Sequence, residues 1–168
     1  MVVAALVTAE QYLHTSFEHD AEFVEGRIIE RPMPTWEHAN LQGFLVRELW
    51  ALGKPMNLFA VPEQRVQTRP ERFRVPDVCL VSRPEGPFGR RIVTKAPYLC
   101  VEILSPEDTM SETLEKVYEY LEFGVSWVWV IDPASRTGQI HTPTGVARVS
   151  DGVFRTDELW VNLNGVEY

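Results

Sequence analysis

The sequence lacks most of the features that identify a function at first sight. Its 168 residues include two cysteines, Cys79 and Cys100, each inside an apolar run, and no closely spaced pairs of Cys or His. We therefore expect buried free thiols, with neither a disulfide framework nor a zinc site. A Gly-rich phosphate loop, a Ser-His-Asp arrangement and a cofactor fingerprint are missing as well. These absences argue against disulfide scaffolds, loop-type nucleotide-binding proteins and serine hydrolases.

Long hydrophobic runs are also missing. No stretch approaches the roughly 20 apolar residues that a membrane-spanning helix needs. The apolar start MVVAALV has neither the basic region nor the length of a signal peptide. We expect a soluble, cytoplasmic protein. The composition, 45% hydrophobic and 24% charged, suits a globular protein, and the length fits one domain over residues 1–168.

Positive charge is scarce too. Sixteen Lys and Arg residues face 24 Asp and Glu residues, so the net charge is −8 and the pI is near 5.0. This balance argues against a general attraction to nucleic acid. Half of the basic residues nevertheless lie in one stretch of the chain: Arg65, Arg69, Arg72, Arg74, Arg83, Arg90, Arg91 and Lys95. Such arginine-rich loops can bind phosphates, or they can be solvated loops that pair with the surplus acids.

What the sequence does contain is a regular alternation of helical and strand-like segments. Three segments have helical apolar spacing: 8–17, 35–53 and 105–124. Thr8 and Thr35 are the expected N-caps of the first two helices, and Gly53 and Gly124 the expected ends of the last two. The apolar stripe expected in the third helix consists of Leu114, Val117, Tyr118 and Leu121.

The strand-like segments complete the pattern. They comprise a hairpin at 23–30 with its turn at Gly26, a strand within 57–68, a turn at 69–74, buried strands at 76–81, 96–105 and 125–133, and short antiparallel strands after residue 136. Trp127, Trp129 and Trp160 are expected in the core. This order of elements predicts an α/β fold in which a mixed sheet is flanked by helices on both faces.

Three residues occupy positions that chemistry could use. Asp77 follows a proline at the start of an apolar strand, and Glu102 lies inside another apolar strand, where a charge is costly unless it is paired or binds a cation. Lys116 lies on the next helix. Each has a simpler explanation: Asp77 as a turn or cap residue, Glu102 facing solvent, and Lys116 as an exposed helix residue paired with Glu112.

The order and surroundings of these residues carry a resemblance to a known family. The strings VPDVCLV and APYLCVEILSPEDTMSETLEKVYEYLEFGVSWVWVIDP resemble the Uma-type endonuclease family, within the PD-(D/E)XK restriction-endonuclease-like superfamily. The match is strong from Arg74 to Pro133. It is looser toward the N-terminus, where Glu22, Glu25 and His38 carry it.

The resemblance implies that Asp77 and Glu102 bind Mg²⁺ or Mn²⁺ and that Lys116 acts beside them. The superfamily lysine two residues after the acid falls here on Leu104, so Lys116 is its natural substitute. Glu22, Glu25 and His38 are possible accessory residues, and so is Glu112, which stands where relatives are expected to carry Asp.

The leading hypothesis is therefore a metal-dependent endonuclease that hydrolyses phosphodiester bonds of DNA, or of RNA, with a metal-activated water. The nucleic-acid contacts are assigned to Arg72, Arg74, Arg90 and Arg91, and a homodimer is expected. One alternative is a nuclease fold without activity that serves as a binding or assembly module, which the acidic charge favours. Another is an enzyme that uses its acidic residues for general acid–base work on a small substrate.

Overall fold

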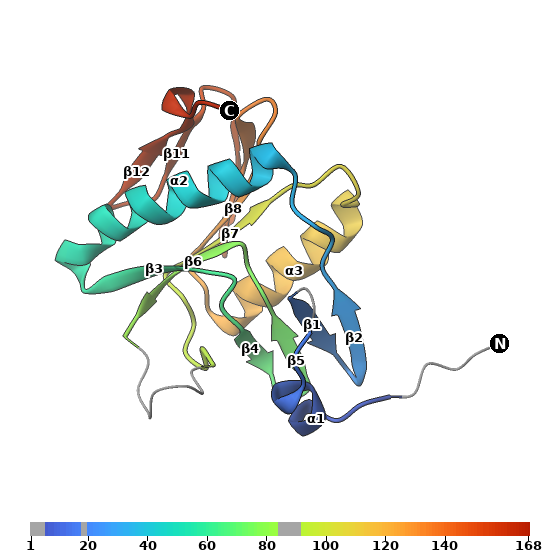
Figure 1. Ribbon diagram of the computed structural model, residues 1–168. Coiled ribbons are helices and arrows are strands. Elements are labelled where there is room, and N and C mark those ends of the chain that lie inside the picture. The colour runs from blue at the N-terminus through green and yellow to red at the C-terminus, as the bar shows by residue number, and fades with distance from the viewer. Residues whose placement is uncertain (1–5, 18–19, 84–91) are drawn as a thin grey trace.

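The computed structural model describes residues 6–17, 20–83 and 92–168, and it contains two main β-sheets with helices packed against them (Figure 1). In chain order the elements are α1 (Ala9–His14), β1 (Ala21–Val24), β2 (Arg27–Glu30), α2 (Trp36–Gly53), the 3₁₀ turn η1 (Lys54–Met56), β3 (Leu58–Pro62), β4 (Val66–Arg69), β5 (Arg72–Arg74), β6 (Val78–Ser82), β7 (Leu99–Ile103), α3 (Met110–Phe123), β8 (Trp127–Asp132), β9 (Thr137–Thr142), β10 (Gly145–Val149), β11 (Val153–Arg155), β12 (Trp160–Asn162) and the 3₁₀ turn η2 (Leu163–Gly165).

The central sheet has the strand order β10-β9-β8-β7-β6-β3 and is mixed. Strands β7 and β8 pair in parallel, and α3 supplies the crossover that parallel neighbours require. The other strand pairs of this sheet are antiparallel. The sheet therefore follows the mixed arrangement that the order of sequence segments predicted.

Two helices cover opposite faces of the central sheet. Because side chains alternate along a strand, Leu99 and Val101 of β7 pack with the apolar stripe of α2 and with the C-terminal strands. The intervening Cys100 packs with Val117 and Tyr120 of α3 on the other face. This confirms the prediction of a mixed sheet flanked by helices on both faces. Glu102 shares the α3 side of the strand, and this alternation is what directs it toward that helix.

The second sheet, of order β2-β1-β5-β4, is smaller and packs under α1. Tyr12, Phe23 and Phe73 form its own aromatic cluster. The hairpin predicted at 23–30 is confirmed: Glu25 (φ 50°) and Gly26 (φ 86°) both take the left-handed conformation that tight two-residue turns need. Strand β5 runs directly toward β6, so the chain passes from the small sheet to the central sheet immediately before Asp77.

The ends of the helices are mostly those that the sequence predicted. The Thr8 and Thr35 hydroxyls accept hydrogen bonds from the first turns of α1 and α2, and Gly124, with φ 105°, ends α3. Gly53 is the last residue of α2, as predicted, but it keeps a helical conformation, and the chain continues through η1 and turns at Asn57 (φ 56°). A Cβ atom on Gly53 would lie 2.8 Å from a methyl group of Leu80, so close packing against the sheet explains this glycine.

Three expectations about individual segments were wrong. Residues 72–74, expected in a turn, form strand β5. Trp160, expected in the core, is 62% exposed, whereas Trp129 is fully buried. On α3, Tyr118 is exposed and the buried apolar face contains Val117 and Tyr120. No helix in the described part of the chain is both long enough and apolar enough to cross a membrane.

Candidate active site

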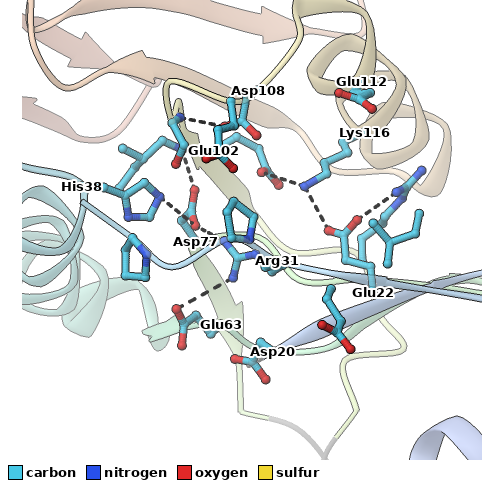
Figure 2. Close-up of a pocket in the computed structure, with 18 of the residues that line it drawn as sticks. Asp20, Glu22, Arg31, His38, Glu63, Asp77, Glu102, Asp108, Glu112 and Lys116 are labelled. Atoms are coloured by element: carbon cyan, nitrogen blue, oxygen red, sulfur yellow. Dashed lines mark hydrogen bonds and ion pairs between the residues drawn. The ribbon is translucent and has the colours of Figure 1, made fainter. Parts of the chain in front are cut away.

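A pocket of about 760 Å³ opens where the two sheets meet. Its walls come from the β1–β2 hairpin and the loop after it, from the start of β6, from the end of β7 and from the first half of α3 (Figure 2). Three carboxylates lie at its base, and each is at most 6% exposed: Glu22 on β1, Asp77 before β6 and Glu102 on β7. The structure thus brings Asp77 and Glu102 into one pocket, together with Lys116 from α3.

Both oxygens of Asp77 have partners. The backbone N–H of Ile103 donates to Oδ2 at 2.6 Å, which ties the start of β6 to the end of β7. Oδ1 accepts a hydrogen bond from the guanidinium of Arg31, and Nε2 of His38 lies 3.3 Å away. Burial acts to raise the pKa of Asp77, but the His38 hydrogen bond and the Arg31 charge outweigh it and lower the pKa. Asp77 is therefore held as a carboxylate.

The pKa of Glu102 is shifted in the opposite direction from that of Asp77. Tyr120 donates a 2.7 Å hydrogen bond to Oε1, and the Lys116 ammonium lies 3.5 Å from Oε2. Burial raises the pKa of Glu102 to about 7, and the negative charges of Asp77 and Glu22 add to this effect although the Lys116 charge opposes it. Two neighbouring carboxylates with pKa values shifted in opposite directions are typical of functional sites.

Lys116 lies between two buried acids. Its ammonium is 3.1 Å from Glu22 and 3.5 Å from Glu102, as the dashed lines in Figure 2 show. Burial acts to lower the pKa of Lys116, but the Glu102 and Glu22 charges raise it above its ordinary value. Lys116 is therefore a fixed cation that points into the pocket, and it is not merely the surface partner of Glu112.

The other sequence candidates have different surroundings. His38 contacts Asp77, as described above. Glu25 lies in the hairpin turn, 66% exposed along its side chain, and pairs with Arg72. Glu112 lines the pocket, where its carboxylate accepts a hydrogen bond from the hydroxyl of Thr109, the N-cap of α3; this hydrogen bond lowers the pKa of Glu112.

The arginines assigned to nucleic acid also separate into groups. Arg74 is 4% exposed, and its guanidinium donates to Glu22 (2.9 Å) and Glu119 (2.7 and 2.8 Å). Arg72 pairs with Glu25 and Glu119 beside it. These contacts make Arg72 and Arg74 part of an internal ion-pair network that joins β5 to α3. Arg90 and Arg91 lie outside the described residues.

Two residues that contact the pocket carboxylates had no assigned function on the sequence alone. Tyr120 lies one helical turn after Lys116 on the same face of α3, so the i, i+4 spacing was a usable signal. Arg31 follows β2 and reaches Asp77 across 46 residues of sequence. Nothing local marks it, because an arginine before a proline-rich loop is commonly a surface residue.

The donor chemistry of the pocket suits a hard divalent cation. Carboxylates outnumber Arg and Lys among the lining residues by ten to three, and carboxylate oxygens are the ligands that hard divalent cations prefer. The described residues contain no cluster of three or more His, Cys, Asp or Glu side chains arranged around a common metal position. A site built on Asp77 and Glu102 is compatible with this, since Mg²⁺ commonly uses one or two carboxylates and takes its remaining ligands from water and phosphate.

Comparison with known proteins gives a consistent assignment. The profile of the Uma2 family, described as "Putative restriction endonuclease", matches residues 9–166. No functionally curated protein matches the chain. Among solved structures, the chain is similar to the 1.96 Å crystal structure of a putative nuclease of the domain family DUF820 from Anabaena variabilis ATCC 29413. That match has a TM-score of 0.81 and 25% identity over 95% of this chain and 97% of the other. Because the profile spans nearly the whole sequence, the chain belongs to the Uma2 restriction-endonuclease family and has the restriction-endonuclease-like fold that the sequence predicted.

Proposed function

We propose that this protein is a divalent-metal-dependent endonuclease whose active site is the pocket around Asp77, Glu102 and Lys116. The observation that carries the proposal is a pair of buried carboxylates, one immediately before β6 and one on the neighbouring strand β7. Their pKa values are shifted in opposite directions, and they share a pocket with a fixed lysine ammonium. Asp77 and Glu102 would hold the cation, Mg²⁺ or Mn²⁺. When bound there, the cation would polarise a phosphoryl oxygen and lower the pKa of a bound water.

The side chains around the metal ligands have roles that their contacts suggest. Lys116 is protonated, so we assign it to stabilising the negative charge that develops on the phosphoryl oxygens, and not to removing a proton. Tyr120 holds the Glu102 carboxylate through its 2.7 Å hydrogen bond. Glu22 anchors Lys116 and is itself fixed by Arg74. The substrate class is DNA, or RNA, as the family assignment suggests.

The test compares cleavage by the wild type with that by three conservative variants, Asp77→Asn, Glu102→Gln and Lys116→Met. Plasmid, linear duplex and single-stranded DNA, and RNA, are incubated with Mg²⁺ or Mn²⁺ and with a chelator. Asp151→Asn is the matched control, because it also removes one carboxylate charge, but from a surface pair with Arg155 outside the pocket. Metal-dependent cleavage by the wild type and the control, lost in all three variants, is expected. Absence of cleavage on every substrate, or equal cleavage by the variants, contradicts the proposal.

One observation favours the second candidate, a nuclease fold that binds without cutting. Every carboxylate at the base of the pocket already contacts a cation of its own chain: Asp77 contacts Arg31, Glu102 contacts Lys116, and Glu22 contacts both Lys116 and Arg74. Calorimetric titration with Mn²⁺ separates the two candidates. If the wild type does not bind Mn²⁺, or if the Glu102→Ala variant binds it equally well, this second candidate replaces the first.

The proposal includes a homodimer, which would bring two pockets to the two strands of a duplex. Exposed apolar side chains on the C-terminal strands, Val146 and Trp160, each 62% exposed, offer surface for such contact. Sedimentation velocity decides the point, and a monomer at working concentration contradicts this part of the proposal.

A further inference from the structure

Arg31 has the position of a built-in counterion for the proposed metal ligand Asp77. Its guanidinium donates to Oδ1 of Asp77, while Oδ2 is taken by the backbone N–H of Ile103. A cation that binds Oδ1 of Asp77 therefore meets a position that Arg31 already fills, beside Nε2 of His38 at 3.3 Å. The Arg31 side chain is 16% exposed and that of Asp77 only 2%, so Arg31 is the more solvent-accessible member of the pair.

Among the cations at the base of the pocket, Arg31 is the one most easily displaced. Three buried carboxylates face three cations there: Glu22, Asp77 and Glu102 against Arg31, Arg74 and Lys116. A divalent cation added to this balanced set would leave an excess of positive charge, which is costly in a buried site. Lys116 and Arg74 each contact two buried acids. Arg31 contacts a single buried acid, Asp77.

Arg31 also has an alternative partner within reach. Its other terminal nitrogen, Nη1, lies 3.8 Å from the carboxylate of Glu63, which is 43% exposed at the pocket rim. The backbone of Arg31 is fixed at the end of β2 by a 3.0 Å hydrogen bond from its N–H to the carbonyl of Asp20. The side chain can therefore turn from Asp77 toward Glu63 while the main chain stays in place. Figure 2 shows Arg31 between these two carboxylates.

We infer that Arg31 sets the cation affinity of this site: its guanidinium occupies Oδ1 of Asp77 until a divalent cation takes that position and Arg31 moves to Glu63. The inference rests on the proposed function, because it takes Asp77 as a metal ligand. It goes further in assigning a specific competitor and a direction of effect. Removing the competitor strengthens metal binding, whereas removing a ligand weakens it.

The test is calorimetric titration with Mn²⁺ of the wild type, Arg31→Met, Arg31→Lys and the control Arg155→Met, which removes an arginine paired with Asp151 outside the pocket. Methionine keeps much of the length and removes the charge; lysine keeps the charge but loses the planar fork that matches a carboxylate. We expect the dissociation constant to fall at least tenfold in Arg31→Met and by less in Arg31→Lys, and to be unchanged in Arg155→Met. The melting temperature provides a second measurement. In chelator, Arg31→Met should melt below the wild type, and excess Mn²⁺ should raise its melting temperature by more.

The outcomes separate this inference from the proposed function. Equal or weaker Mn²⁺ binding by both Arg31 variants, in a wild type that binds Mn²⁺ and cleaves DNA, overturns the competitor role and leaves the nuclease intact. If the wild type cleaves no substrate but the Arg31 variants bind Mn²⁺ more tightly than it does, the competitor role is supported and the proposed nuclease activity is contradicted. If no variant binds Mn²⁺, Arg31 competes with nothing and the inference is wrong.

Discussion

Replacing Glu102 with glutamine should change how the stability of the protein depends on pH. Burial raises the pKa of this carboxyl from 4.5 to about 7, so the folded state binds its proton more tightly than the unfolded state does. The stabilisation from that proton is fully present below pH 4.5 and is lost as the pH rises through 7. At 1.36 kcal/mol per pKa unit, the shift corresponds to about 3 kcal/mol, of which about 2.5 kcal/mol falls between pH 5 and pH 8.

Glutamine cannot ionise, so the Glu102→Gln variant does not lose this stabilisation as the pH rises. Its amide oxygen can still accept the hydrogen bond of Tyr120, which leaves the amide nitrogen facing the Lys116 ammonium. Because Lys116 stays charged throughout this pH range, that repulsion adds a constant offset to the free energy of unfolding. The informative quantity is therefore the change with pH in the difference between variant and wild type.

The assay is urea and thermal unfolding of both proteins in chelator at pH 5, 6, 7 and 8. The free energy of unfolding of the variant should rise relative to the wild type by about 2.5 kcal/mol from pH 5 to pH 8, or roughly 5 to 10 °C in melting temperature for a chain of this length. Glu122→Gln is the control on the same side of the sheet, since the Glu122 carboxylate is 65% exposed and pairs with Arg69 at the surface. A difference between Glu102→Gln and the wild type that is constant from pH 5 to pH 8 would refute the reasoning, because the Lys116 charge would then outweigh burial.

Three further predictions concern stability and reactivity. Arg74→Met should lower the free energy of unfolding by about 3 to 5 kcal/mol, measured by urea unfolding, because it removes the buried guanidinium that pairs with two buried glutamates, Glu22 and Glu119; a loss below 1 kcal/mol contradicts the network. Gly138→Ala should destabilise the protein by several kcal/mol or prevent folding, since its Cβ would lie 2.0 Å from the carbonyl oxygen of Val130; a wild-type melting curve contradicts this. Native protein at pH 8 should react slowly with iodoacetamide and quickly in urea, because burial raises the pKa of Cys79 to about 12 and that of Cys100 well above its ordinary value; mass spectrometry measures the labelling, and fast labelling of native protein contradicts it.

Much of the fold could be predicted because its signals are local. Thr35 caps a helix and Gly124 ends one for reasons that a few neighbouring residues determine. Strand β5 was not predicted because its composition, Arg-Phe-Arg, resembles a surface turn. It becomes a strand through pairing with β1, about 50 residues earlier, and through burial of its second arginine among carboxylates. Neither cause can be seen in the local sequence.

The buried face of α3 shows why periodicity alone misplaced part of the site. The predicted stripe included Tyr118, but the side that faces the sheet also carries polar groups, because the pocket lies there. Glu119, which pairs with Arg74, is 5% exposed and breaks the apolar pattern. An amphipathic helix that contributes to a buried polar site therefore has a weaker apolar stripe than its packing would suggest. The same feature identifies Tyr120, whose buried hydroxyl reaches Glu102.

The net charge of −8, which seemed to oppose a nucleic-acid function, has a different meaning once the pocket is located. Ten of the 24 acidic residues line this one pocket, so much of the negative charge is concentrated where the proposed cation would bind. A phosphate backbone approaching the cation-free pocket would meet repulsion, and divalent cations bound there would reduce it. Under the proposed function, the metal would be needed for substrate binding as well as for chemistry.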